Sequence, residues 1–93
     1  MALKTTKFDA AEYLDSPEAI QAFLTDAYEN GDQAEFLHAI GIAARAKGMT
    51  EVARQARLGR ESLYKALAGD GNPSFATVDK VLKALGVKFA IAA

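Results

Sequence analysis

Apolar residues recur every three or four positions through most of the chain, which is the spacing of one face of an α-helix. Ser16 followed by Pro17 predicts the start of one helix, because serine caps helices and proline suits their first turn. Asn30 and Gly31 end this helix. The face that we expect to be buried consists of Ile20, Phe23, Leu24, Ala27 and Tyr28.

A second helix follows immediately. Asp32 and Glu35 have the spacing of a capping box, and Gly48 closes the segment. Asp9 and Glu12 repeat the capping-box spacing near the N-terminus, ahead of a very short helix. The second helix should bury Phe36, Leu37, Ile40, Ala43 and Ala44.

The C-terminal part of the sequence predicts one more helix, after which the spacing of apolar residues changes from that of a helix to that of a strand. Ser74 opens a helix expected over residues 74–85, with Phe75, Val78, Val81, Leu82 and Leu85 on its buried face. After Gly86, the apolar residues Val87, Phe89 and Ile91 alternate with other residues, which predicts a β-strand over residues 87–92.

A lone strand cannot satisfy its own backbone hydrogen bonds, and no second strand is evident in the chain. We therefore expect the strand to pair with its copy as an antiparallel ribbon, with Val87, Phe89 and Ile91 forming the interface of a homodimer.

Residues 49–68 predict two short helices joined by a tight turn. Thr50 is a candidate N-cap of the first, which has Val52, Ala53 and Ala56 on one face. The sequence Arg57-Leu58-Gly59 interrupts the helical pattern. The second helix then has Leu63, Ala66 and Leu67 on its buried side.

This spacing resembles the helix-turn-helix of the lambda-repressor/Cro class. Small Ala53 lies where the helices would cross, Leu58 fills the space between them, and Leu63 meets both. Arg57 departs from the pattern, because that position usually holds a left-handed glycine, and another residue there costs roughly 1 kcal/mol. The plainer alternative is a pair of helices that only pack together.

The helix-turn-helix predicts a DNA-binding surface, because a major groove admits one helix. Arg60, Glu61, Tyr64 and Lys65 face outward on the second helix and are expected to read bases. Arg60, at the helix start, is the best candidate for a guanine contact. The residues expected to contact DNA phosphates are Arg54, Arg57, Asn72 and Ser74.

The net charge of −1 is low for a DNA-binding protein, but it averages two unlike halves. Residues 1–37 contain eight acidic and two basic side chains, a net charge of −6. Residues 38–93 contain nine basic and four acidic side chains, a net charge of +5. This asymmetry suggests two partners of opposite charge, although two ordinary solvated surfaces would give the same count.

The 93 residues suit one small all-α domain, without cysteines for disulfides. No apolar run has the length of a membrane span or of a signal peptide's core, so we expect a cytoplasmic protein with no membrane association. We expect no enzyme, metal site or cofactor. His38 is the one histidine, and no nucleophile–base pair or metal-ligand cluster has suitable spacing.

Nearly the whole chain resembles a known family. The segments FDAAEYL, ARAKGMTEVARQARLGRESLYKAL and GDGNPSFATVDKVLKALGVK, together with the acidic second helix, are similar to those of HigA-like antitoxins, which are addiction-module antidote proteins. The resemblance implies a recognition helix over Arg60–Ala68. It places Gly59 where many members have a serine cap.

The expected architecture is therefore an all-α, five-helix, lambda-repressor-like domain over residues 1–93, with N-terminal helices in 1–48, a short first helix and a C-terminal strand. The resemblance implies a bacterial antitoxin that neutralises a RelE/HigB-like ribonuclease toxin and represses its own operon. We expect the toxin to dock on the acidic N-terminal half. The alternatives are a stand-alone phage-type repressor and a protein-interaction module that no longer binds DNA. The acidic residues expected nearest the toxin are Asp9, Glu12, Asp15 and Glu18.

Overall fold

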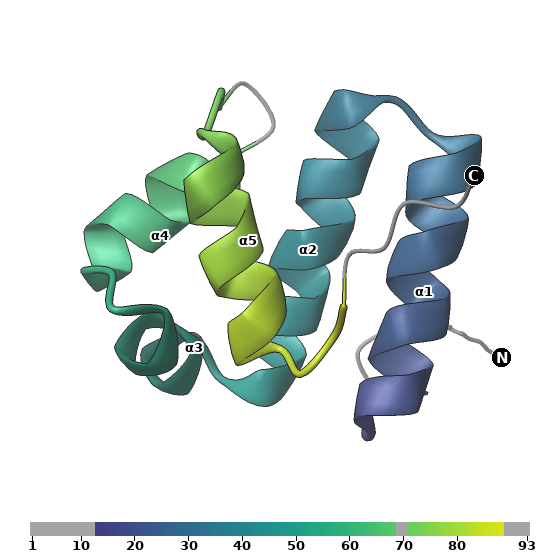
Figure 1. Cartoon of the computed structure of the whole chain (residues 1–93), viewed down its shortest axis with the longest axis horizontal. Helices are drawn as coiled ribbons and strands as arrows, with labels where there is room; N and C mark the ends of the chain where they lie inside the picture. The colour runs from purple at the N-terminus through teal and green to yellow at the C-terminus, as the bar shows by residue number, and fades with distance from the viewer. Residues whose placement is uncertain (1–12, 69–70, 89–93) are drawn as a thin grey trace, which may run out of the picture.

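The computed structural model describes residues 13–68 and 71–88, which form five α-helices (Figure 1). In this view α3 and α4 occupy the left, the antiparallel hairpin of α1 and α2 occupies the right, and α5 lies between them. α1 packs mainly on α2, and α3 packs on α5 and α2. The helices are α1 (Pro17–Asn30), α2 (Gln33–Lys47), α3 (Met49–Ala56), α4 (Arg60–Ala66) and α5 (Phe75–Ala84).

The predicted helix caps are present. The Ser16 hydroxyl accepts a hydrogen bond from the Ala19 N–H at 3.1 Å, and the Ser74 hydroxyl accepts one from the Thr77 N–H at 3.2 Å. Asp32 and Glu35 form the complete capping box, with bonds of 2.8 and 2.9 Å between each side chain and the other's backbone N–H. These caps satisfy amides that a helix start leaves without internal partners.

Of two expectations near helix starts, one is wrong and the other lies almost entirely outside the described residues. Thr50 is not an N-cap, because α3 already begins at Met49 and Gly48 precedes it without a side-chain hydrogen bond. Gly48, with φ 112°, ends α2 and begins α3. The very short first helix lies almost entirely outside the described residues, and so do Asp9 and Glu12.

The core lies where the helices meet. Its most deeply buried side chains come from every helix except α1, which contributes Ile20 and Leu24 at 5% and 4% exposure. Two residues predicted on buried faces are exposed instead: Tyr28 is 57% exposed and Phe75 is 67% exposed. Tyr28 lies at the edge of its apolar stripe and meets Phe36 edge-on, and Phe75 lies in the first turn of α5. The largest fully buried side chains are Ile40, Val52, Leu63, Val81 and Leu85.

The predicted strand over residues 87–92 is wrong for its described part. Val87 is buried, and its N–H bonds to the Leu82 carbonyl at 3.1 Å. The Gln21 side-chain amide pairs with both the N–H and the C=O of Lys88, each at 3.1 Å. These backbone groups are therefore already used within the chain, which leaves them unavailable to a second strand. Phe89 and Ile91 lie outside the described residues.

A lysine joins the ends of two helices. The Lys47 ammonium, at the end of α2, donates to the Ala84 carbonyl at the end of α5 at 2.8 Å. A cation in this place satisfies a carbonyl that a helix end leaves without an internal partner. Within the described residues, no helix combines the length and the apolar character that crossing a membrane requires.

Candidate nucleic-acid interface

The turn between α3 and α4 is a Schellman motif. Arg57 has φ 59° and ψ 43°, in the left-handed region. Its N–H bonds to the Arg54 carbonyl at 3.2 Å, and the Leu58 N–H bonds back to the Ala53 carbonyl at 2.9 Å. These are the two hydrogen bonds that define the motif and satisfy the last carbonyls of α3.

The same motif ends α5, with glycine in the left-handed position. Gly86 has φ 79° and bonds to the Lys83 carbonyl at 3.0 Å, and the following Val87 bonds back to Leu82. The comparison confirms that Arg57 occupies a position for which glycine is the unstrained choice. The left-handed conformation costs a residue with a side chain about 1 kcal/mol or more.

Apolar side chains from α3, the turn and α4 hold α4 against α3. Ala53 and Leu63 are buried, and Leu58 packs against the same core from the turn. The three residues predicted to define the helix-turn-helix therefore all belong to one core or pack against it.

The outward face of α4 holds the predicted base-reading residues, and Arg60, Glu61, Tyr64 and Lys65 are all exposed. Two of them interact. The Arg60 guanidinium lies over the Tyr64 ring, 5.7 Å from its centroid, and donates to the Tyr64 hydroxyl at 3.4 Å. The sequence analysis missed this pair, although the spacing of four residues on one helix places such side chains next to each other.

Arg54, expected at a phosphate, is paired within its own helix. Its guanidinium forms a two-pronged salt bridge with Glu51, which also accepts a hydrogen bond from Gln55 at 2.6 Å. The hydrogen bond from Arg54 is the main cause that lowers the pKa of the Glu51 carboxyl. Arg54 remains exposed, so a phosphate could reach it by competing with Glu51.

The loop before α5 lies against α4. A shallow groove of about 420 Å³ runs between them, and Lys65 and Asn72 both line it. Gly71 approaches α4 so closely that a Cβ there would lie 2.7 Å from the Lys65 carbonyl oxygen and 3.0 Å from that of Ala68. Asn72 is exposed, and the Ser74 hydroxyl caps α5.

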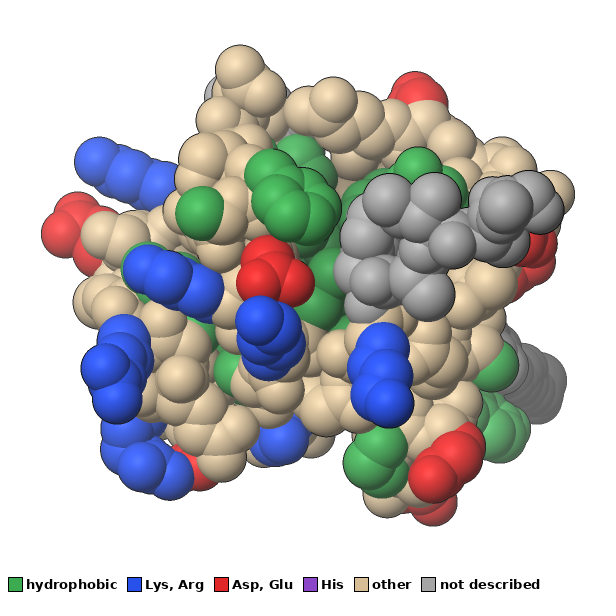
Figure 2. Space-filling view, viewed as in Figure 1, with side chains coloured by type: hydrophobic (Ala, Val, Ile, Leu, Met, Phe, Trp, Pro, Cys, Tyr) green, Lys and Arg blue, Asp and Glu red, His purple; other side chains and the backbone are tan. Residues whose placement is uncertain are grey.

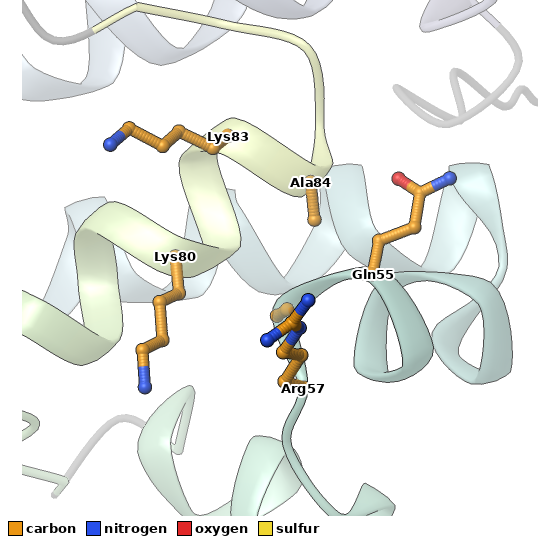
Figure 3. Close-up of a pocket in the computed structure, with 6 residues that line it drawn as sticks. Gln55, Arg57, Lys80, Lys83 and Ala84 are labelled. Carbon is orange, nitrogen blue, oxygen red and sulfur yellow. The ribbon is translucent and has the colours of Figure 1, made fainter.

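A second hollow places Arg57 beside two lysines that the sequence analysis did not single out. It has a volume of about 240 Å³ and lies between the end of α3 and α5. Arg57 reaches into it from the turn, and Lys80 and Lys83 extend from α5 (Figure 3). Lys83 pairs with Asp79 at 3.1 Å. Residues spaced three apart on one helix, such as Lys80 and Lys83, share a face, which was the available signal.

The charge of the described residues is divided between two regions. Residues 13–37 hold six acidic side chains and no basic one. The described residues from 38 onward hold nine basic and three acidic ones. Figure 2 shows Lys and Arg side chains over the part of the molecule formed by α3, α4 and α5.

The remaining predicted residues are separate from this surface. Asp15 and Glu18 are exposed at the start of α1. Val87, predicted at a dimer interface, is instead in the core. His38 is exposed on α2, and no group of metal-binding side chains occurs among the residues that the structure describes.

Comparison with known proteins identifies relatives by sequence. The model of a family described as "Probable addiction module antidote protein" matches residues 4–93. A protein of Haemophilus influenzae (strain Rd), described as "Uncharacterized protein", is 49% identical over 84 residues, covering 90% of this chain and 87% of that one. No solved structure gave a significant match.

Proposed function

Because this chain belongs to the family of probable addiction module antidote proteins, we propose that it is the DNA-binding antitoxin of a type II toxin–antitoxin module. An antidote of this kind acts on a toxin. The toxin that we propose is a RelE/HigB-like ribonuclease, and the DNA is the promoter of the protein's own operon. In this role the protein acts by binding in the cytoplasm, and it needs neither catalysis nor a cofactor.

The observation that carries the proposal is the exposed face of α4, held by the left-handed turn at Arg57. Leu63 anchors the back of the helix in the core, and Arg60 and Lys65 extend from its front. A short helix with an apolar back and a cationic front suits the major groove. Arg60 would contact guanine, and Arg57, Asn72 and Ser74 would meet phosphates beside it.

A dimer would let two copies of α4 reach half-sites about one DNA turn apart, so we propose a homodimer. Since Val87 and Lys88 are occupied within the chain, the interface would have to lie elsewhere. Deleting residues 89–93 and measuring the mass by light scattering tests whether the segment with Phe89 and Ile91 contributes. If the shortened chain is a monomer, residues 89–93 contribute to the dimer interface. If it is still a dimer, the interface lies on the helices.

The test of DNA binding compares the duplex upstream of the gene with a scrambled duplex of equal length and composition, by fluorescence anisotropy over a salt series. We expect tighter binding to the upstream duplex, with affinity falling as salt rises. Arg60→Ala should lose roughly 1–3 kcal/mol of discrimination. If this variant keeps the affinity and the preference of the original protein, α4 is not the reading helix.

Copurification with the product of the neighbouring gene tests whether this protein binds a toxin. Promoter binding without such a partner would favour a stand-alone repressor. Partner binding without any promoter binding would favour a protein-interaction module.

A further inference from the structure

Arg60 and Tyr64 form an ordered pair on the surface of α4. The planar guanidinium lies over the ring at 5.7 Å from its centroid, and one of its nitrogens, Nη2, donates to the hydroxyl at 3.4 Å. Tyr64 is 46% exposed, so the pair faces solvent. A cation–π contact and a hydrogen bond together favour one arrangement of an otherwise flexible side chain.

Ordering of this kind matters for an arginine that reads a base. A free arginine side chain loses much rotamer freedom when it is fixed on a partner, and this loss weakens binding. A contact already made in the unbound protein removes part of that loss before DNA arrives. The contact with Tyr64 therefore reduces the rotamer freedom that Arg60 would still have to lose on binding a base.

We propose that Tyr64 is a positioning residue for Arg60, which holds the guanidinium ready to contact guanine, and that Tyr64 does not read a base itself. The inference rests on the proposed DNA-binding function and identifies how α4 obtains its specificity. It also revises the expectation that Tyr64 itself reads a base.

The pairing leaves the guanidinium able to bind guanine. Arginine has five N–H donors in one plane, and its Nη2 carries two of them. Donation of one hydrogen to the Tyr64 hydroxyl leaves the other free. The Nε hydrogen and both Nη1 hydrogens are not used by the hydrogen bond to Tyr64, and a guanine presents N7 and O6 to such donors. The contact with Tyr64 and base reading can therefore use different hydrogens of the same guanidinium.

The test selects binding sites for the full chain from a pool of randomised duplexes. Arg60→Ala identifies the position at which Arg60 imposes a guanine preference. Tyr64→Leu removes both the ring and the hydroxyl, and Tyr64→Phe keeps the ring. Tyr28→Leu makes the same chemical change at an exposed tyrosine on α1 and is the matched control. Circular dichroism verifies that each variant is folded.

We expect Tyr64→Leu to reduce the guanine preference at that position by about two- to fivefold, the range of an exposed cation–π contact. Preferences at other positions should remain, and Tyr64→Phe should lose less. In the Arg60→Ala background, Tyr64→Leu should have no further effect there. In the DNA-free protein, ¹⁵N relaxation of the Arg60 Nε should show greater mobility in Tyr64→Leu than in the original chain.

Several results would overturn the inference. A further loss of preference in the Arg60→Ala background would mean that Tyr64 contacts a base directly. Unchanged mobility of the Arg60 Nε in Tyr64→Leu would mean that the ring does not hold it. If the original chain enriches no sequence, the proposed DNA-binding function fails, and the positioning role fails with it. If it enriches a sequence that Tyr64→Leu leaves unaltered, only the positioning role fails.

Discussion

Arg57 is the residue with the clearest conflict between conformation and side chain. It has a left-handed backbone in the same hydrogen-bonded turn that Gly86 forms at the end of α5. We expect Arg57→Gly to raise the free energy of unfolding by up to about 1 kcal/mol, because glycine removes the strain. Arg57→Ala keeps the strain and should give no gain. Urea denaturation measures both, and equal stability of the two variants would contradict the strain.

The same two variants separate strain from charge in DNA binding. Both remove the guanidinium, so each should reduce the slope of affinity against salt by about one if Arg57 meets a phosphate. The gain in stability should appear only in Arg57→Gly. A salt slope equal to that of the original chain in both variants would place Arg57 away from the DNA backbone.

Gly71 is a second position where one added side-chain atom should change the stability of the fold. An added Cβ would lie within about 3 Å of carbonyl oxygens of Lys65, Ala66 and Ala68, at the end of α4. We expect Gly71→Ala to lower the free energy of unfolding by about 1–3 kcal/mol, because this backbone must shift. Gly59→Ala is the control, since its Cβ would meet nothing within 4 Å. Thermal unfolding of both variants distinguishes the crowding from the general effect of replacing glycine.

At the scale of the helices, the sequence predicts a helix start correctly where the capping residue and the amide that it bonds lie close together in the chain. Ser16, Ser74 and the Asp32–Glu35 pair bond to amides three residues away, so nearby sequence contains the whole interaction. Tyr28 and Phe75 were misplaced because periodicity identifies an apolar stripe but not how far a neighbour covers its edges. The same limit applies to the site: spacing places residues on the face of α4, whereas the groove between Lys65 and Asn72 depends on tertiary packing.

The predicted strand failed for a related reason. Alternation of Val87 with Lys88 is also what results when a buried residue closes a helix end and the next residue leaves it. The Gln21 side chain that occupies the Lys88 backbone lies 67 residues away in sequence. No local pattern contains such a partner.

The salt bridge within α3 gives the protein one pH dependence with a definite sign. The pKa of Glu51 is lowered in the folded chain, chiefly by its hydrogen bond from Arg54. The salt bridge therefore contributes fully to the stability of the folded chain above pH 4.5, the ordinary pKa of this carboxyl. Its contribution to stability is lost as the pH falls through the lowered pKa of Glu51.

We expect the difference in melting temperature between the original chain and Glu51→Gln to shrink over that acid range. The effect should be small because both partners are exposed. Glu61→Gln is the control, since Glu61 forms no ion pair with the described residues. A difference that does not vary with pH would contradict the assignment.

At the scale of the whole molecule, the separation of charge predicts two independent electrostatic behaviours. Asp15 and Glu18 belong to a stretch with no basic residue among those described. We expect Asp15→Lys with Glu18→Lys to slow association with the proposed toxin at low salt, because a ribonuclease needs a basic surface. The effect should fade at high salt. Stopped-flow binding measures the rate.

The matched control reverses charge in the other region. Lys80→Glu with Lys83→Glu should leave the rate of toxin association unchanged and weaken binding to DNA, since these lysines share a hollow with Arg57. If the α1 variant associates at the original rate at low salt, the acidic half does not steer the toxin, and its charges serve only to cap helices and to keep the surface hydrated.

The Gln21 contact also makes two neighbouring amides into separate reporters of motion. The Val87 N–H bonds to the backbone of Leu82, so its hydrogen exchanges with solvent deuterium only when the end of α5 opens. The Lys88 N–H bonds at the surface to the half-buried side chain of Gln21, so its release needs only a rotation of that side chain. Lys88 should therefore exchange much faster than Val87, and a partner that seats on this part of α1 would slow Lys88 while leaving Val87 as it was.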